Sequence, residues 1–175
     1  MDAKTRRKKI IEKLQASETP ISASVLAKNL SVSRQIIVGD VALLRAENHP
    51  IEATPRGYVL GLGAAAYPFI GALVCKHGIG QVEEELTTIV DYGGTCLDVA
   101  IEHSLYGELI GKLNISSRYD VTQFMEQIRT SDKPLSLLSN GLHTHHIGCK
   151  DEETFHQIQN ALYDLSIALE KHKAE

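Results

Sequence analysis

At 175 residues and 43% hydrophobic content, the chain can bury one ordinary core or two small ones. It has no run of eighteen apolar residues and no signal-peptide core, so we expect a cytoplasmic protein without a membrane segment. Cys75, Cys96 and Cys149 are too widely spaced for a disulfide framework or a CxxC metal motif, and we expect them to be reduced core residues. The net charge of −4 divides unevenly along the chain. Residues 1–60 carry ten Lys or Arg against six Asp or Glu, whereas residues 61–175 carry eight Lys or Arg against sixteen Asp or Glu. This division is typical of a DNA-binding module joined to a domain with another task.

Three helices are predicted in the first fifty residues. The first spans residues 5–16, where apolar residues recur at helical spacing among lysines and arginines. Ser22 can cap a short second helix, and Ser33 can cap a third that runs from Arg34 to about Glu47. The side chains expected to face the core include Ile10, Leu14, Leu26, Leu30, Ile37, Val41 and Leu44.

Two short helices joined by a tight turn have the geometry by which a recognition helix enters the major groove of DNA. Residues 50–53 and 57–60 are predicted as the strands of a wing, with Arg56 at its tip. The predicted DNA contacts are Ser33, Arg34, Gln35, Val38, Arg45 and Arg56. A three-helix bundle with a hairpin that binds protein, or nothing, is the alternative, but the turn, the wing and the basic charge together favour DNA.

The small residues at 61–66 predict a linker between a winged helix-turn-helix domain (1–60) and a second domain (67–175). Strands are predicted at 67–76, 95–102, 107–114 and 142–149, and helices at 80–92, after Ser116-Ser117, and at 152–171. The fold class is therefore α+β, with a ferredoxin-like βαββαβ second domain and an extra C-terminal helix. Apolar residues all around this last helix leave open whether it is core or a dimer interface.

Four residues of the second domain are predicted to meet at one corner of its sheet. In the expected topology the end of the first strand lies beside the start of the fourth, which brings His77 near His143 and His145, two residues apart on one face. Glu85 lies in the helix after His77, within reach of the same corner. Three imidazoles and a carboxylate suit a divalent transition metal. Surface or core histidines are the alternative; His146 points to the opposite face.

The chain resembles the nicotinate-responsive repressors of NAD biosynthesis (NiaR type), which pair a winged helix-turn-helix with a 3H domain. The matching segments are LAKNLSVSRQ (26–35), DVALLRA (40–46), PIEATPRGYVL (50–60), CKHG (75–78), EEELTTIVDYGGT (83–95), SLYGEL (104–109) and GLHTHH (141–146). Ser104 and His146 depart from the family pattern, which has proline and threonine there. The resemblance implies a homodimer that binds operator DNA when nicotinic acid is present as co-repressor, with nickel or zinc held by His77, Glu85, His143 and His145.

The effector is expected at the same corner, with His103 and Tyr106 as candidate contacts. The residues leave three alternatives open: a regulator whose signal is the metal itself, a metal-dependent hydrolase in which an open metal position activates water, and an interaction module with a structural metal. Because an enzyme has little use for a helix-turn-helix and no further acidic residue is placed as a general base, we expect a regulator and not an enzyme.

Overall fold

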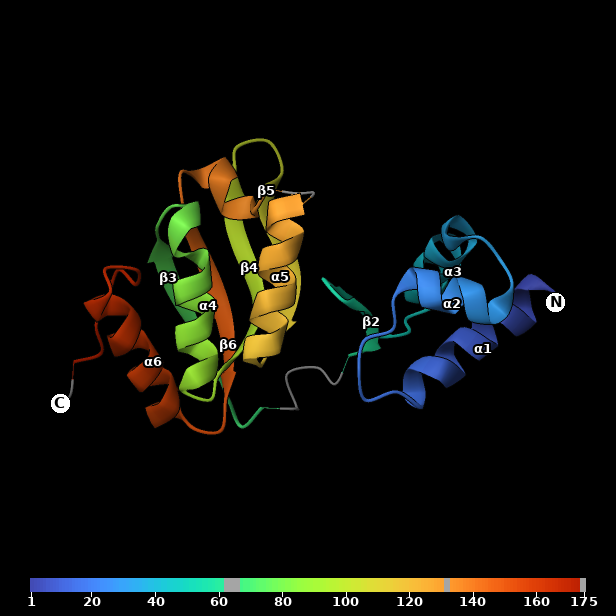
Figure 1. Ribbon diagram of the computed structural model, residues 1–175, viewed down its shortest axis with the longest axis horizontal. Coiled ribbons are helices and arrows are strands. Elements are labelled where there is room, and N and C mark those ends of the chain that lie inside the picture. Colours follow the sequence, from blue (N-terminus) through green and yellow to red (C-terminus); the bar gives the residue numbers. More distant parts are fainter. Residues whose placement is uncertain (62–66, 131–132, 174–175) are drawn as a thin grey trace. The chain divides into compact units, whose positions relative to one another are not determined.

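The computed structural model describes residues 1–61, 67–130 and 133–173. The chain divides into two compact units, Met1–Gly63 and Ala64–Glu175, and each has a hydrophobic core of its own. The first holds three helices and a small hairpin, and the second a sheet covered by helices (Figure 1). Of the predicted linker only Gly61 falls within the described residues. No helix in the described part of the chain is long and apolar enough to cross a membrane.

The N-terminal unit forms the predicted helix-turn-helix and wing. Its elements are α1 (Ala3–Gln15), α2 (Ala23–Leu30), α3 (Arg34–Ala46), β1 (Ile51–Thr54) and β2 (Gly57–Leu60). The hydroxyls of Ser22 and Ser33 accept hydrogen bonds from backbone N–H groups three residues ahead, as predicted for N-caps. Such caps are each worth about 1 kcal/mol. Ser31 ends α2 in a left-handed conformation and makes the turn before α3.

The core of this unit is aliphatic, and ion pairs from Arg6 and Arg7 to Asp40 lie at its edge. Its buried members come from all three helices and β1, and are Ile10, Leu14, Ala23, Leu26, Ala27, Leu30, Ile37, Val41, Leu44 and Ile51. The Arg6 guanidinium donates to the buried Asp40 carboxylate and so fastens α1 to α3. Reciprocal backbone hydrogen bonds between Ile21 and Tyr58 hold the wing against the loop before α2. The helices and the wing therefore pack as one body.

The C-terminal unit has the predicted βαββαβ order and extra helix. Its elements are β3 (Phe69–Lys76), the 3-10 turn η2 (Ile79–Gln81), α4 (Val82–Asp91), β4 (Thr95–His103), β5 (Gly107–Ile115), α5 (Arg118–Thr130), η3 (Leu135–Ser139), β6 (Leu142–Cys149) and α6 (Glu152–Asp164). All pairings in the sheet are antiparallel, and the strand order is β3-β6-β4-β5. The predicted α+β class is confirmed.

Each βαβ unit of this domain is split by a strand from the other unit. The strands β3 and β4 are joined through α4 and enclose β6, while β5 and β6 are joined through α5 and enclose β4. The first and fourth strands are neighbours, as predicted, and Cys75 is paired with His143 in their register. In this variant of the ferredoxin-like arrangement the fourth strand, β6, is a central strand. Its histidines therefore have a neighbouring strand on each side, β3 and β4.

Helices α4, α5 and α6 cover one face of the sheet (Figure 1). The core between them contains buried residues of every strand and of all three helices, including Leu73, Leu86, Cys96, Ile115, Val121, Ile147 and Ile158. Gly71 and Gly94 allow the close approach of helix side chains, since a Cβ at these positions would lie 2.4 Å from the Phe155 ring and 2.6 Å from Ile158. Helix and sheet are therefore in direct contact across this face.

The last helix is shorter than predicted. It ends at Asp164, not at residue 171, because Ser166 takes a left-handed conformation and the chain turns back along β3. Lys76 N–H donates to the Ile167 carbonyl, and Leu169 N–H donates to the Val74 carbonyl. This pairing satisfies backbone hydrogen-bonding groups at the open edge of β3. The apolar periodicity of the sequence does not reveal the stabilisation that it provides. Ile167 is buried in the core at this point.

Candidate metal centre and nucleic-acid interface

The carboxylate of Glu85 is the centre of a buried cluster of three imidazoles. It lies in the first turn of α4 and is 1% exposed. Its oxygens are 2.7 Å from Nε2 of His77, 3.0 Å from Nε2 of His143 and 2.8 Å from Nε2 of His145. The structure thus brings together all four residues that the sequence predicted as metal ligands.

The local structure of three elements places these groups. His77 directly follows β3, and η2 then turns the chain so that α4 returns Glu85 over the same corner. His143 and His145 alternate with outward-facing residues along β6, so both rings lie on the helix-covered face. Gly141 sits against the His77 backbone, because its left-handed φ of +85° and its lack of a side chain allow this contact.

Backbone carbonyls fix the orientation of every ring. Nδ1 of His77, His143 and His145 lies 2.7, 2.8 and 2.7 Å from the carbonyl oxygens of Gly78, Gly141 and Asp98. A carbonyl only accepts, so each Nδ1 carries a proton and each Nε2 faces Glu85. A bare Nε2 lone pair against a carboxylate oxygen is repulsive, and either a proton or a cation must supply positive charge there. Metal-binding histidines have this same arrangement of the two nitrogens.

The electrostatics of the cluster favour an ionised carboxylate beside positive charge. Burial acts on Glu85 to favour its neutral form, but the three histidines outweigh it and hold the pKa of Glu85 well below its usual range. Burial likewise opposes the charged form of His145, yet Cys96 and Glu85 together raise its pKa well above the usual value. The pKa of His77 is also raised, since Glu85 and the Gly78 carbonyl outweigh burial. An ionised Glu85 beside protonated His77 and His145 is therefore the favoured charge state of the cluster.

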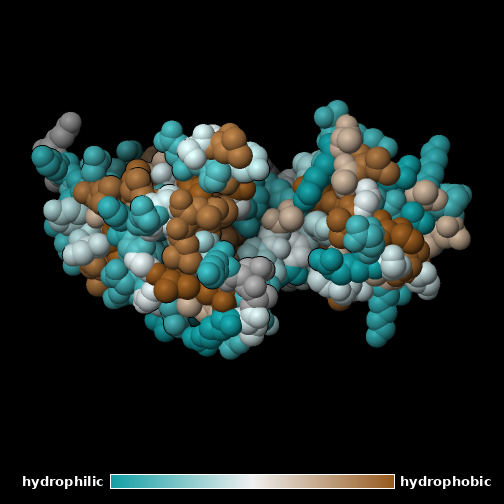
Figure 2. All heavy atoms as spheres, turned by 90° about the horizontal axis from the view of Figure 1, so that it is seen from above, coloured by the Kyte–Doolittle hydropathy of each residue, from teal (hydrophilic) through white to brown (hydrophobic). Residues whose placement is uncertain are grey.

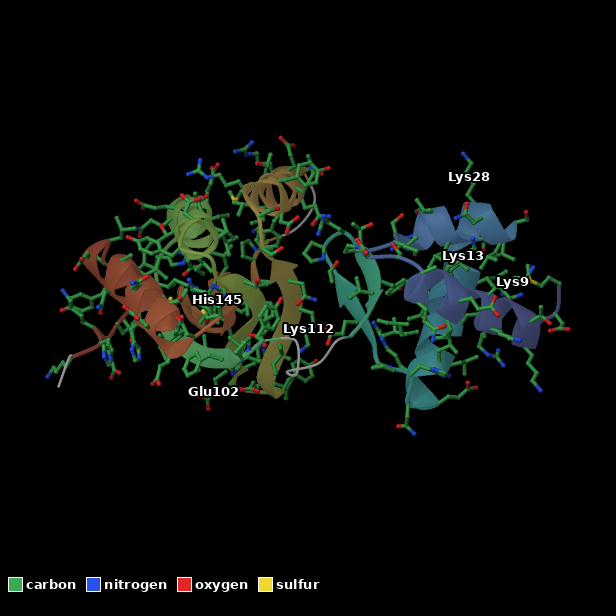
Figure 3. The ribbon with its side chains drawn as sticks, turned by 90° about the horizontal axis from the view of Figure 1, so that it is seen from below. Lys9, Lys13, Lys28, Glu102, Lys112 and His145 are labelled. Atoms are coloured by element: carbon green, nitrogen blue, oxygen red, sulfur yellow. The ribbon has the colours of Figure 1, made fainter. Side chains whose placement is uncertain are left out.

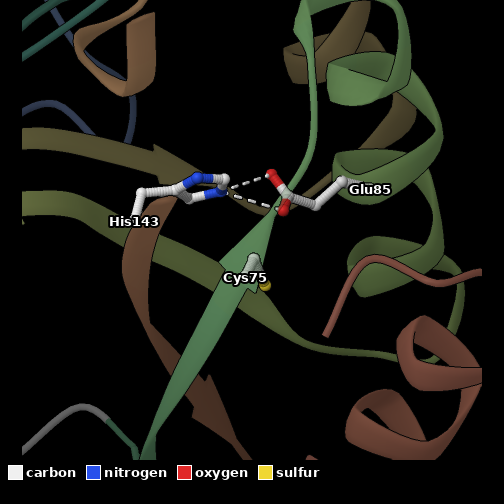
Figure 4. A group of neighbouring side chains, drawn as sticks. All are labelled: Cys75, Glu85 and His143. Carbon is white, nitrogen blue, oxygen red and sulfur yellow. Dashed lines mark hydrogen bonds and ion pairs between the residues drawn. The ribbon is translucent and has the colours of Figure 1, made fainter. Parts of the chain in front are cut away.

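A cysteine that the sequence analysis assigned to the core borders this cluster. Cys75 is fully buried, and a Glu85 oxygen, a His143 ring nitrogen and the Cys75 sulfur all lie within 4.8 Å of one another (Figure 4). Its spacing of two residues from His77 was an available signal, because alternate residues of a strand share a face. Cys96 lies on the other side of the cluster, with its sulfur 3.3 Å from Nδ1 of His145.

Asp98 lies at an irregularity in β4 and accepts hydrogen bonds through both its backbone carbonyl and its side-chain carboxylate. The register shifts between Cys96 and Ala100, and within this stretch the Asp98 carbonyl accepts from His145. The Asp98 carboxylate accepts from the backbone N–H and Nδ1 of His146, at 3.0 and 2.9 Å. His146 therefore lies away from the Glu85 cluster, as predicted, and no sequence pattern pointed to the carbonyl of Asp98.

A cavity of about 40 Å³ adjoins the cluster. Its polar wall consists of the cluster itself and the buried Ser136 of η3. Its apolar wall contains Val82, Leu86, Val99, Leu113, Phe124 and Leu135. This end of the unit is at the top of Figure 1 and faces the viewer in Figure 2, where apolar side chains gather on its surface. Leu137 and Leu138 of η3 are among the exposed apolar residues.

The predicted effector contacts His103 and Tyr106 do not line this cavity. They form the β4–β5 turn, where Nδ1 of His103 accepts from the backbone N–H groups of Leu105 and Tyr106. The two rings stack at 5.1 Å, and Tyr106 is largely exposed. These contacts account for His103 as a turn-forming residue, and its role toward an effector stays a prediction.

The predicted DNA contacts gather at both ends of α3 and in the wing. Arg34 and Gln35 are exposed in the first turn of α3, directly after the capping Ser33. Val38 is half-buried and packs against the helical core. Arg45 donates from Nε to the Ile51 carbonyl, with its guanidinium over the Tyr58 ring, and so also joins α3 to the wing. Arg56 is half-buried in the wing turn.

The lysines of α1 and α2 are further cations of this unit and are not among the predicted DNA contacts. Lys9 and Lys13 on α1 and Lys28 on α2 are labelled in Figure 3, where Lys28 extends away from its helix. His145, labelled in the same view, lies inside the other unit between helices and sheet. Cations of this kind contribute phosphate contacts, which add affinity without sequence preference.

Comparison with known proteins gives two domain matches and two close relatives. An HTH domain matches residues 6–59, and the 3H domain matches residues 71–171. The probable transcription repressor NiaR of Thermotoga maritima is 41% identical over 169 residues, which cover 95% of this chain and 94% of the relative. The transcription repressor NadR of Bacillus subtilis is 39% identical over 168 residues, with coverage of 94% and 93%.

Proposed function

The chain belongs to the 3H-domain family of transcription repressors, and from this membership we propose that it represses genes of NAD biosynthesis or nicotinate uptake with nicotinic acid as co-repressor. Its relatives are DNA-binding regulators and not enzymes, so the buried cluster serves regulation and not turnover. One observation carries the proposal: three Nε2 atoms converge on Glu85 in the C-terminal unit, separate from the helix-turn-helix domain.

In this proposal His77, Glu85, His143 and His145 hold one nickel or zinc ion. The support is chemical, because each Nδ1 is already used on a carbonyl and the three Nε2 lone pairs need positive charge in front of them. Imidazole and carboxylate donors suit borderline divalent ions. When bound, the ion supplies a positive charge that attracts an anionic effector.

The effector binds in the cavity beside the cluster. Phe124, Leu135 and Val99 offer an apolar wall to the flat pyridine ring, and Ser136 is a buried hydroxyl within the same lining. The carboxylate then lies toward the cluster, which supplies the charged groups among the described residues of this lining. Pockets of this kind bind a ring by apolar contact and orient it by a few polar groups. The cavity is small, and η3 is the element that we expect to move when the effector enters.

The N-terminal unit reads the operator as half of a homodimer. Arg34 is placed to pair with guanine and Gln35 with adenine at the start of α3, while the Ser33 hydroxyl contacts a phosphate. Two copies related by a twofold axis read a palindrome, with half-sites about one helical turn apart. Nicotinic acid acts only if it binds the DNA-competent dimer more tightly than the other state, and operator DNA must then tighten effector binding by the same factor.

The deciding experiment measures binding of the purified protein to a labelled fragment of its own upstream region, at fixed salt and known metal content. Affinity that rises with nicotinic acid, but not with nicotinamide or benzoic acid, supports the proposal, since the first analogue lacks the carboxylate and the second the ring nitrogen. Affinity that follows added metal and ignores nicotinic acid replaces it with a metal-responsive regulator. Chelation that melts the C-terminal unit without any effector response identifies a structural ion.

A further inference from the structure

The thiol of Cys75 is a soft donor at the edge of the Glu85 cluster. It lies on β3 directly opposite His143 of β6, and both side chains point to the helix-covered face. Sulfur, a Glu85 oxygen and a His143 ring nitrogen lie within 4.8 Å of one another, a spacing that one ion can bridge after small side-chain rotations. All three residues are buried, so water does not compete for these positions.

The second thiol near the cluster is placed differently. The Cys96 sulfur lies 3.3 Å from Nδ1 of His145, which is the nitrogen turned toward the Asp98 carbonyl. Nε2 of His145 points the other way, toward Glu85. Cys96 therefore lies behind its histidine, whereas Cys75 lies beside the carboxylate that the ion would share. The two cysteines form a matched pair in which burial is the same and position differs.

We propose that Cys75 is a thiolate ligand of the metal centre, completing a set of three imidazoles, one carboxylate and one sulfur. The inference rests on the proposed metal site and adds a donor to it. Metal binding at this position releases the thiol proton, because the ligand form of cysteine is the thiolate. A sulfur donor favours zinc, nickel and copper over manganese and magnesium.

The test uses the full chain, stripped of metal and then loaded with one equivalent of zinc or cobalt(II). X-ray absorption of the zinc form separates a sulfur at about 2.3 Å from nitrogen and oxygen at about 2.0–2.1 Å. The cobalt form reports a thiolate by its near-ultraviolet charge-transfer absorption. We expect both signals in the wild type and in Cys96→Ser. We expect neither in Cys75→Ser, whose zinc affinity falls by more than the roughly 10–100-fold loss caused by changes around the ligands.

The outcomes separate the two proposals. Stoichiometric zinc with only nitrogen and oxygen neighbours in the wild type overturns the role of Cys75 and leaves the metal centre intact. A sulfur signal that disappears in Cys96→Ser but not in Cys75→Ser overturns it as well. Absence of stoichiometric binding by the folded wild type overturns the metal centre itself. The wild-type absorption measurement decides the question even if Cys75→Ser does not fold.

Discussion

Replacing Glu85 with glutamine removes the charge at the centre of the cluster and keeps its volume. In the metal-free protein this 1%-exposed carboxylate lies 2.7–3.0 Å from three Nε2 atoms. Removing one partner of a buried ion pair costs about 3–5 kcal/mol. For a unit of this size each kcal/mol lowers Tm by roughly 4 °C, so we expect Glu85→Gln to lower the Tm of the C-terminal unit by roughly 12–20 °C.

The pH of the measurement follows from the pKa shifts. The raised pKa values of His77 and His145 stabilise the fold fully below their ordinary value of 6.5 and lose this effect as the pH rises through the folded values. The lowered pKa of Glu85 stabilises the fold above its ordinary value of 4.5. Both contributions are present together between these values, so the loss in Glu85→Gln is largest near pH 6 in the presence of a chelator.

Differential scanning calorimetry measures this loss, with Glu84→Gln as the control because Glu84 is an exposed neighbour on the same helix. Equal Tm values for Glu85→Gln and the wild type near pH 6 would refute the argument, since the carboxylate would then not be paired with charged histidines. Adding zinc at 100 times its Kd stabilises the wild type by about 2.7 kcal/mol. Glu85→Gln should gain less, and an equal gain would show that Glu85 is not a ligand.

Three further outcomes are expected. Metal affinity falls as the pH decreases, because protons on Nε2 of His77 and His145 compete with the ion; calorimetric titration in buffers of different ionisation enthalpy counts the protons released, and a count of zero would contradict this. Gly141→Ala destabilises the C-terminal unit by about 1–3 kcal/mol and weakens zinc binding, since φ is +85° and the new Cβ would meet the His77 carbonyl; an unchanged Tm would exclude this strain. Arg34→Ala weakens operator binding by about 1–3 kcal/mol at an unchanged Tm, whereas Arg45→Ala also lowers the Tm because its bond to the wing is lost; equal melting of the two variants would remove that distinction.

The sequence predicted the sheet corner because that prediction needed only element order and the two-residue period of strands. His143 and His145 share a face whatever the details of the sheet, and His77 follows the neighbouring strand in any topology that pairs first with fourth. Glu85 was predicted because a residue early in the helix that follows His77 can reach the same corner of the sheet. The helix-turn-helix was equally accessible, since Ser22 and Ser33 mark both helix starts.

What the sequence did not predict depends on tertiary partners. Residues 165–169 leave the helix because β3 has an open edge that their backbone can pair with, and edge pairing leaves no trace in apolar periodicity. The carbonyl of Asp98 orients His145 only because β4 is irregular at that point. Cys75 was assigned to the core because a buried cysteine and a ligating cysteine have the same local pattern; the difference lies in what its sulfur faces across the sheet.

The proposed donor set also bears on which ion lets an effector act. The four proposed protein donors would satisfy zinc in its usual tetrahedral form, and a fifth from Cys75 would leave it no position for a further ligand. A six-coordinate ion with the same five donors retains one position, and the cavity lined by Phe124 and Leu135 adjoins the cluster. If the effector carboxylate binds the ion directly, the response therefore requires an ion of higher coordination number, and nickel fits this better than zinc. A response of equal size with either ion would instead place the carboxylate on the protein, with Ser136 as the nearest buried hydroxyl in the cavity lining.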